Sequence, residues 1–174
     1  ASARMAEGRA PDFTSVHVGA GTTMQYRYLM GYELAPGLQK WGDVIPFSNS
    51  GPGKTGKVNT EIIASGAYSF EPAPLNMDPT DSVMINTIPG NGAAHHQMGS
   101  GTSHATPTTA GGAALGFQAY FVTHGEFPAA DHAKAVLMGA ADDMHFDPFK
   151  QGAGWLNAAT FCKLMSGGDA TVSY

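Results

Sequence analysis

Several features that are common in soluble proteins are scarce in this chain of 174 residues. It has one cysteine, Cys162, so no disulfide can form within the chain. Only 13% of its residues are charged, its net charge is −5, and lysine and arginine do not cluster, which leaves no basic patch for a nucleic acid or an anionic lipid. The longest weakly polar stretch, residues 110–122, is far shorter than the ~20 apolar residues of a membrane span. We therefore expect neither nucleic-acid binding nor membrane insertion.

Glycine and proline, with 23 and 11 residues, are abundant and predict many turns. The hydrophobic fraction of 43% is enough for a core, and the length favours a single domain. Short strands are predicted where β-branched residues recur and glycine or proline follows, at residues 15–20, 44–47, 61–64 and 82–88. The prolines of residues 70–80 predict mostly irregular chain.

The second half of the chain is predicted to be helical. Residues 106–123 lack charge and are rich in alanine and glycine, which is typical of a helix buried on nearly every side. Its small residues 110–114 are expected to pack against neighbouring backbone. Further helices are predicted over residues 129–142, after Pro128, and over residues 155–165, before a pair of glycines. Strands followed by helices, with a buried helix among them, indicate part of an α/β layered fold.

A serine stands where a glycine-rich turn meets the uncharged helix, in residues 99–107 (GSGTSHATP). Serine at a helix start commonly caps the helix by accepting a backbone N–H, and the spacing alone favours this interpretation for Ser103. The alternative is nucleophilic catalysis, because a helix N-terminus supplies positive potential and free N–H donors for an oxyanion. Gly99 and Gly101 would then allow a substrate backbone to approach closely.

The segment Gly101-Thr102-Ser103-x-Ala105-Thr106-Pro107 resembles the nucleophile signature of the subtilisin-like serine peptidases, or subtilases. Five further segments resemble motifs of that family and follow its order: SVHVGA at 15–20, FSNSGP at 47–52, IIASG at 62–66, KAVLM at 134–138 and QGAGWLNA at 151–158. The chain departs from the family at His104, where methionine is usual. This resemblance implies a subtilisin-like three-layer α/β fold with a mostly parallel sheet, of which residues 1–174 form only the C-terminal portion.

The same resemblance implies a serine endopeptidase that cleaves a peptide or protein substrate through an acyl-enzyme on Ser103. Ser100, Gly101 and Thr102 would lie beside the oxyanion or the substrate. The chain contains neither an Asp-x-Gly nor a His-Gly-Thr-His motif. The catalytic aspartate, the histidine and the oxyanion asparagine are therefore expected from an N-terminal portion of the same peptidase or from a second subunit. An extracellular or secreted location is expected, no cofactor or metal site is predicted, and calcium is suggested by the resemblance alone.

Two alternatives stay open at this stage. The chain could supply its own general base from the histidines that flank the serine, His95, His96 or His104, since a triad is recognised by geometry and not by chain order. The remaining histidines are expected to be surface or packing residues, namely His17, His124, His132 and His145. The second alternative is a non-catalytic relic of the family that serves as a structural or binding subunit.

Overall fold

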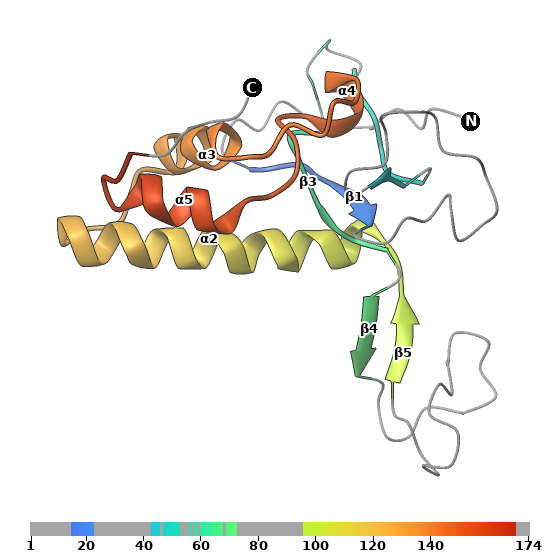
Figure 1. Ribbon diagram of the computed structural model, residues 1–174, viewed down its shortest axis with the longest axis horizontal. Helices are drawn as coiled ribbons and strands as arrows, with labels where there is room; N and C mark the ends of the chain where they lie inside the picture. Colours follow the sequence, from blue (N-terminus) through green and yellow to red (C-terminus); the bar gives the residue numbers. More distant parts are fainter. Residues whose placement is uncertain are drawn as a thin grey trace.

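The computed structural model describes residues 15–22, 43–45, 47–52, 56, 58, 60–67, 69–72 and 96–169. Its elements in chain order are β1 (Val18–Thr22), β2 (Asp43–Val44), β3 (Ile62–Ser65), β4 (Ser69–Pro72), β5 (His96–Gly99), α2 (Thr102–His124), α3 (Ala130–Gly139), α4 (Pro148–Gln151) and α5 (Ala158–Met165). Figure 1 shows the long helix α2 with α5 alongside it, the strands β1 and β3 near its first turns, and the hairpin β4–β5 projecting away. No helix in the described ranges is long and apolar enough to cross a membrane.

A three-stranded sheet of order β2-β1-β3 forms the centre of the described region. β1 runs parallel to β3, with Val18 opposite Ile62, and antiparallel to the short β2. A separate two-stranded sheet pairs β4 antiparallel to β5, with Ser69 opposite Gly99. The end of β5 is therefore held next to the start of β4, only a few residues beyond β3.

Most of the predicted strands are confirmed, although their ends move by a few residues. β1 and β3 correspond to the predictions at residues 15–20 and 61–64, and β2 covers only the beginning of the one at 44–47. The prediction at 82–88 lies outside the described residues. The prediction of irregular chain is wrong for residues 70–72, because β5 supplies a pairing partner and the proline stands at the strand end.

Helix α2 is buried along one stripe only, formed by Ala105, Thr109, Gly112 and Gly116. Ala110, Gly111 and Ala114, which were expected to be buried, are exposed, and a Cβ at Gly111 would have no neighbour within 4 Å. The prediction of a helix buried nearly all round is therefore wrong for this chain. α5, β1 and β3 pack against α2 and cover its buried stripe, and Tyr120 of α2 also meets His132 of α3.

The core beneath α2 depends on its glycines. Phe161 of α5 is fully buried, and its ring occupies the place where a side chain at Gly116 would lie. Leu156 packs in the same way against Gly112, where an added Cβ would lie 3.3 Å from Leu156 Cδ2. Ile62 of β3 joins Phe161 in one apolar cluster that α3 also lines. These glycines let α5 approach α2 closely enough to bury an aromatic ring.

The last two main helices are shorter than predicted. α5 begins at Ala158, because Trp155 is extended: it forms a β-bridge with Ile63 and exchanges backbone hydrogen bonds of 2.7 and 2.8 Å with Asp142. Asn157 then caps α5, its side chain accepting the N–H of Thr160 at 2.9 Å. α3 covers Ala130–Gly139 within the predicted 129–142, and the short α4 was not predicted.

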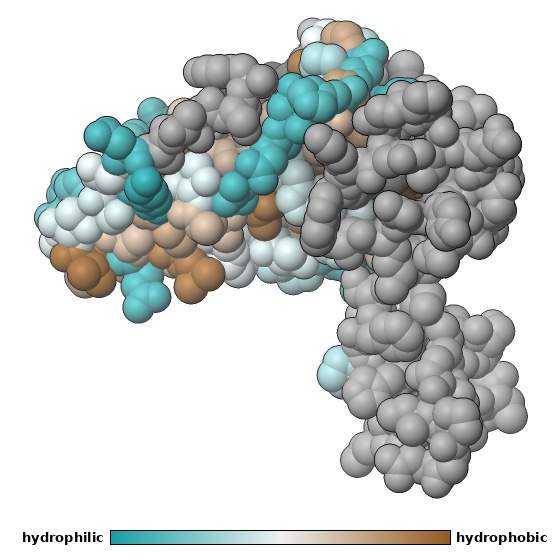
Figure 2. All heavy atoms as spheres, in the orientation of Figure 1, coloured by the Kyte–Doolittle hydropathy of each residue, from teal (hydrophilic) through white to brown (hydrophobic). Residues whose placement is uncertain are grey.

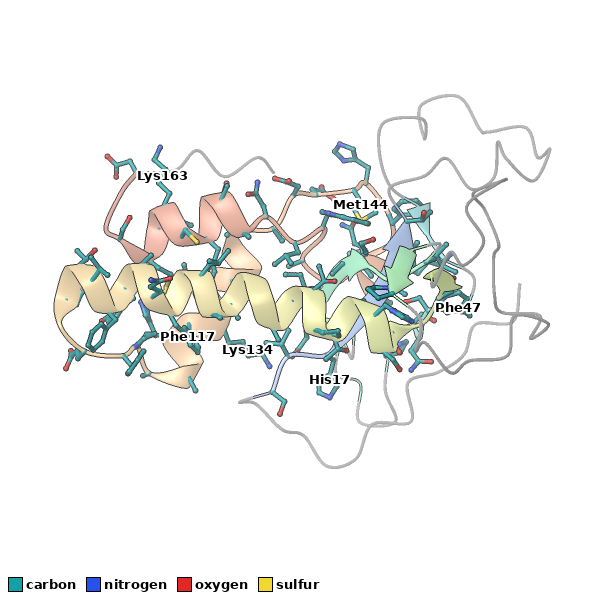
Figure 3. All side chains as sticks on the ribbon, turned by 90° about the horizontal axis from the view of Figure 1, so that it is seen from below. His17, Phe47, Phe117, Lys134, Met144 and Lys163 are labelled. Carbon is teal, nitrogen blue, oxygen red and sulfur yellow. The ribbon has the colours of Figure 1, made fainter. Side chains whose placement is uncertain are left out.

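A buried ion pair fastens α3 to the sheet. Lys134 Nζ lies 2.8 Å from Glu61 Oε1 and donates to the carbonyl of Ser15 at 2.6 Å. Glu61 is 4% exposed, and its Oε2 accepts the backbone N–H of His17 at 2.9 Å. Figure 3 shows His17 and Lys134 below α2 and Lys163 above it. Removing one partner of such a pair leaves a buried charge without compensation.

We expect Lys134→Met to lower the free energy of unfolding by about 3 kcal/mol, because the buried Glu61 carboxyl group would lose its cationic partner. Lys163→Met is the matched control, since Lys163 is exposed on α5 and surface substitutions usually change stability by less than about 0.5 kcal/mol. Urea unfolding of the assembled protein measures both. Equal midpoints for the two variants would show that the ion pair contributes nothing.

Candidate active site

The turn between β5 and α2 brings Ser103 to the surface. Gly101 is the N-cap of α2, without a side-chain capping bond, and its carbonyl accepts the N–H of His104 at 3.0 Å. Ser103 is therefore the second residue of the helix, and its side chain is exposed. The interpretation of Ser103 as the helix cap is wrong, because glycine holds the capping position.

The turn lies at the carboxyl-terminal ends of the parallel strands β1 and β3. Gly101 N–H donates to the carbonyl of Gly66, just past β3, at 2.6 Å. Gly66 N–H in turn donates to the carbonyl of Gly21 in β1 at 2.9 Å. α/β proteins place their ligand sites at this edge of a sheet, where loops and helix N-termini converge. The position of Ser103 is that of a functional residue in such a fold.

The electrostatics of the turn favour a negative charge near Ser103. α2 has 23 residues and no acidic residue in its first turn, so its N-terminal partial positive charge is not offset by its own side chains. The N–H groups of Thr102 and Ser103 come before the first intrahelical hydrogen bond and can donate to an anion. Ser100 is exposed beside them. Ser100, Gly101 and Thr102 thus adjoin Ser103 in this turn, and their role toward a substrate stays a prediction.

The described histidines outside the turn have structural contacts. His17 Nδ1 lies 3.3 Å from Glu61 Oε2, next to the amino-terminal end of β1. His124 stacks on Tyr120 with ring centroids 4.0 Å apart, and His132 meets the edge of the same ring at 5.9 Å, both at the far end of α2 from Ser103. His104 is half-buried directly after Ser103, His96 lies in β5, and His95 is outside the described residues.

The aspartates of the loop after α3 accept hydrogen bonds from neighbouring residues. Asp143 accepts hydrogen bonds from Gln151 Nε2 at 2.7 Å and from the backbone N–H of His145 at 2.8 Å. The Gln151 hydrogen bond, followed by that of His145, lowers the pKa of the Asp143 carboxyl. Asp142 accepts from Asn157 Nδ2 at 3.0 Å. In the described ranges, no group of three or more histidine, cysteine, aspartate or glutamate side chains is arranged to hold a metal ion.

One element of the site was missed by sequence reasoning. Gly66 was noted only as the end of a strand motif. In the structure its carbonyl accepts the Gly101 N–H, and the Gly101 carbonyl lies beside its Cα. A pattern of sequence letters contains no signal for this contact, because the two glycines are separated by the whole hairpin β4–β5.

A family model identifies the family of this chain, and solved structures show a similar fold. The profile of the subtilase family, Peptidase_S8, matches residues 7–155. The crystal structure of a lanthipeptide protease is similar with 24% identity and a TM-score of 0.60, over 86% of this chain and 41% of that one. The structure of the prenylagaramide maturation protease PagA is similar with 21% identity and a TM-score of 0.53, over 88% of this chain and 43% of that one. The chain thus spans less than half the length of either protease. A search of curated protein sequences gives no match.

Proposed function

Since the chain belongs to the subtilase family of serine peptidases, we propose that it is the nucleophile-bearing portion of a serine endopeptidase. Its fold is the partial subtilisin-like α/β fold that the sequence predicted. The observation that supports the proposal most strongly is the placement of Ser103: exposed, in the first turn of a long helix, at the carboxyl-terminal edge of parallel strands. Secretion of the assembled enzyme is part of the same proposal.

In the proposed mechanism, Ser103 Oγ attacks the carbonyl carbon of a peptide bond. A histidine base takes the hydroxyl proton and then gives it to the leaving amine, and water hydrolyses the acyl-enzyme. The backbone N–H of Ser103 donates to the oxyanion at the positive end of α2, where developing negative charge is stabilised. The histidine, its aspartate partner and the second oxyanion donor, an asparagine, are supplied by an N-terminal portion of the peptidase or by a second subunit.

The exposed face of α2 supports a missing partner. No aspartate, glutamate, lysine or arginine occurs in residues 101–125, and Leu115, Phe121 and Val122 are 54%, 44% and 78% exposed. Figure 2 shows two hydrophobic patches along the lower side of α2, with a hydrophilic residue between them. A helix that lacks charge on every side is normally buried on every side, and contiguous apolar surface marks an interaction site. We propose that the portion carrying the other catalytic groups covers this face.

A fluorophosphonate probe tests the nucleophile. In the assembled peptidase it should label Ser103, and Ser103→Ala should abolish both labelling and peptide hydrolysis without a change in the thermal midpoint. Ser166→Ala, an exposed serine at the end of α5, is the control that keeps both. Undiminished hydrolysis by Ser103→Ala would reject the assignment. A folded assembly that neither hydrolyses peptides nor reacts with the probe would favour the non-catalytic relic.

A further inference from the structure

Gly66 is enclosed by the start of the nucleophile helix. It is buried just beyond β3, and a Cβ added there would lie 2.8 Å from the carbonyl oxygen of Gly101 and 3.0 Å from Ala105 Cβ. On its other side the same Cβ would lie 2.8 Å from Ala20 Cβ in β1. Real Cβ atoms do not approach other heavy atoms this closely, so any side chain at position 66 must displace a neighbour.

The neighbour on the Ser103 side is backbone and cannot rotate away. Gly101 contacts Gly66 twice, through its N–H, which donates to the Gly66 carbonyl at 2.6 Å, and through the carbonyl that faces the missing Cβ. That same carbonyl accepts N–H groups from His104 at 3.0 Å and from Ala105 at 3.4 Å, the bonds with which α2 begins. A shift of the Gly101 carbonyl therefore shifts the first turn of the helix, which contains Ser103.

The backbone of the first turns of α2 lacks one helical hydrogen bond. Pro107 lies inside the helix and has no N–H to donate to the carbonyl of Ser103, four residues before it. The contact between Gly101 and Gly66, together with the packing of Ala105 against Ala20 and Ala64, thus sets the direction in which Ser103 leaves the sheet edge. Misplacing a reacting group by about 1 Å can reduce a rate by about 100-fold.

We propose that Gly66 is a positioning residue for the nucleophile: its missing side chain lets the Gly101 carbonyl rest against the end of β3 and so fixes the place of Ser103. The inference depends on the proposed function of Ser103. Gly66 itself touches neither the scissile bond nor the Ser103 side chain in this arrangement, and it acts through Gly101.

A substitution at a second crowded glycine serves as the control that distinguishes a misplaced Ser103 from a general loss of stability. Gly19 lies in β1 of the same sheet, and a Cβ there would lie 2.5 Å from Ile63 Cδ1, 2.8 Å from Thr60 Cγ2 and 2.9 Å from Ser48 Oγ. These distances are as short as those at Gly66, but the atoms are the ends of side chains that can shift, and none of them belongs to the nucleophile turn. Gly19→Ala should therefore lower stability and leave Ser103 in place.

The test compares wild type, Gly66→Ala and Gly19→Ala in the assembled peptidase, at a temperature where all three are folded. Both variants should show a lower thermal midpoint. The rate constant for fluorophosphonate labelling of Ser103, and kcat with a peptide substrate, should fall by about 100-fold in Gly66→Ala, with little change in KM. In Gly19→Ala both rates should stay near the wild-type values. Equal labelling of Gly66→Ala and wild type would overturn the positioning role, whereas a wild type that is never labelled would overturn the proposed function instead.

The double variant Ala20→Gly with Gly66→Ala keeps the inference testable where Gly66→Ala fails to fold. It removes the clash within the sheet and retains the clash with the Gly101 carbonyl. A folded double variant with slow labelling supports the positioning role. Restoration of wild-type labelling would reject it, because crowding against Ala20 would then account for the whole effect.

Discussion

Gly116→Leu should prevent this chain from folding, whereas Gly111→Leu, on the same helix, should leave its helical content unchanged. A Cβ at Gly116 would coincide with the ring of Phe161, which is fully buried and has nowhere to move. Overpacking of a core costs about 1–3 kcal/mol, and expelling a buried phenylalanine costs about 3–5 kcal/mol. Expulsion of the ring is therefore comparable in cost with the lower end of the 5–15 kcal/mol that typically separates a folded domain from its unfolded chain.

Gly111 is the control, because a Cβ there meets no atom within 4 Å. Its leucine variant should instead interfere with whatever covers the exposed face of α2. Far-ultraviolet circular dichroism of each variant mixed with the N-terminal portion measures helical content against the unsubstituted chain, and gel filtration of the same samples measures assembly. Equal loss of helical content in both variants would contradict the packing of α5 against one face of α2.

The helix α2 could be predicted from the sequence, but its buried face could not. An amphipathic helix marks its inner face by periodic hydrophobic residues, and α2 has no charged residue to mark its outer face. Gly111, Gly112 and Gly116 are chemically identical in the sequence. Only Phe161, on another helix, distinguishes Gly116 as a contact position, and that contact depends on tertiary packing.

The candidate nucleophile was predictable because its evidence is local. A glycine turn followed by a helix start is contained within a few consecutive residues, and the motif drew attention to Ser103 at once. The support of that turn is not local, since Gly66 and Gly101 lie on either side of β4 and β5 in the sequence and meet through tertiary structure. The start of α5 was misplaced for the same reason: Trp155 is extended by its pairing with Ile63 and Asp142, which are distant in sequence.

Expressed without the N-terminal portion, residues 1–174 should hydrolyse no casein and should self-associate. Without a histidine and an aspartate beside it, the Ser103 hydroxyl is a weak nucleophile near neutral pH, and loss of general-base catalysis alone costs about 10²–10⁴ in rate. Leu115, Phe121 and Val122 would face water along α2. Each Å² of apolar surface left exposed forgoes roughly 25 cal/mol, so association of these faces is favourable.

Addition of a polypeptide that carries the missing aspartate, histidine and asparagine should convert the aggregate into a defined assembly and produce casein hydrolysis. The Ser103→Ala chain is the control: it should assemble in the same way, since Ser103 is exposed and outside the buried stripe of α2, and yet stay inactive. Gel filtration of these samples measures assembly, and a casein assay of the same samples measures peptide hydrolysis. A soluble, monomeric and active product from residues 1–174 alone would reject the need for a partner. It would also mean that His95, His96 or His104 serves as the general base. Of these three, His104 lies directly beside Ser103 in the first turn of α2.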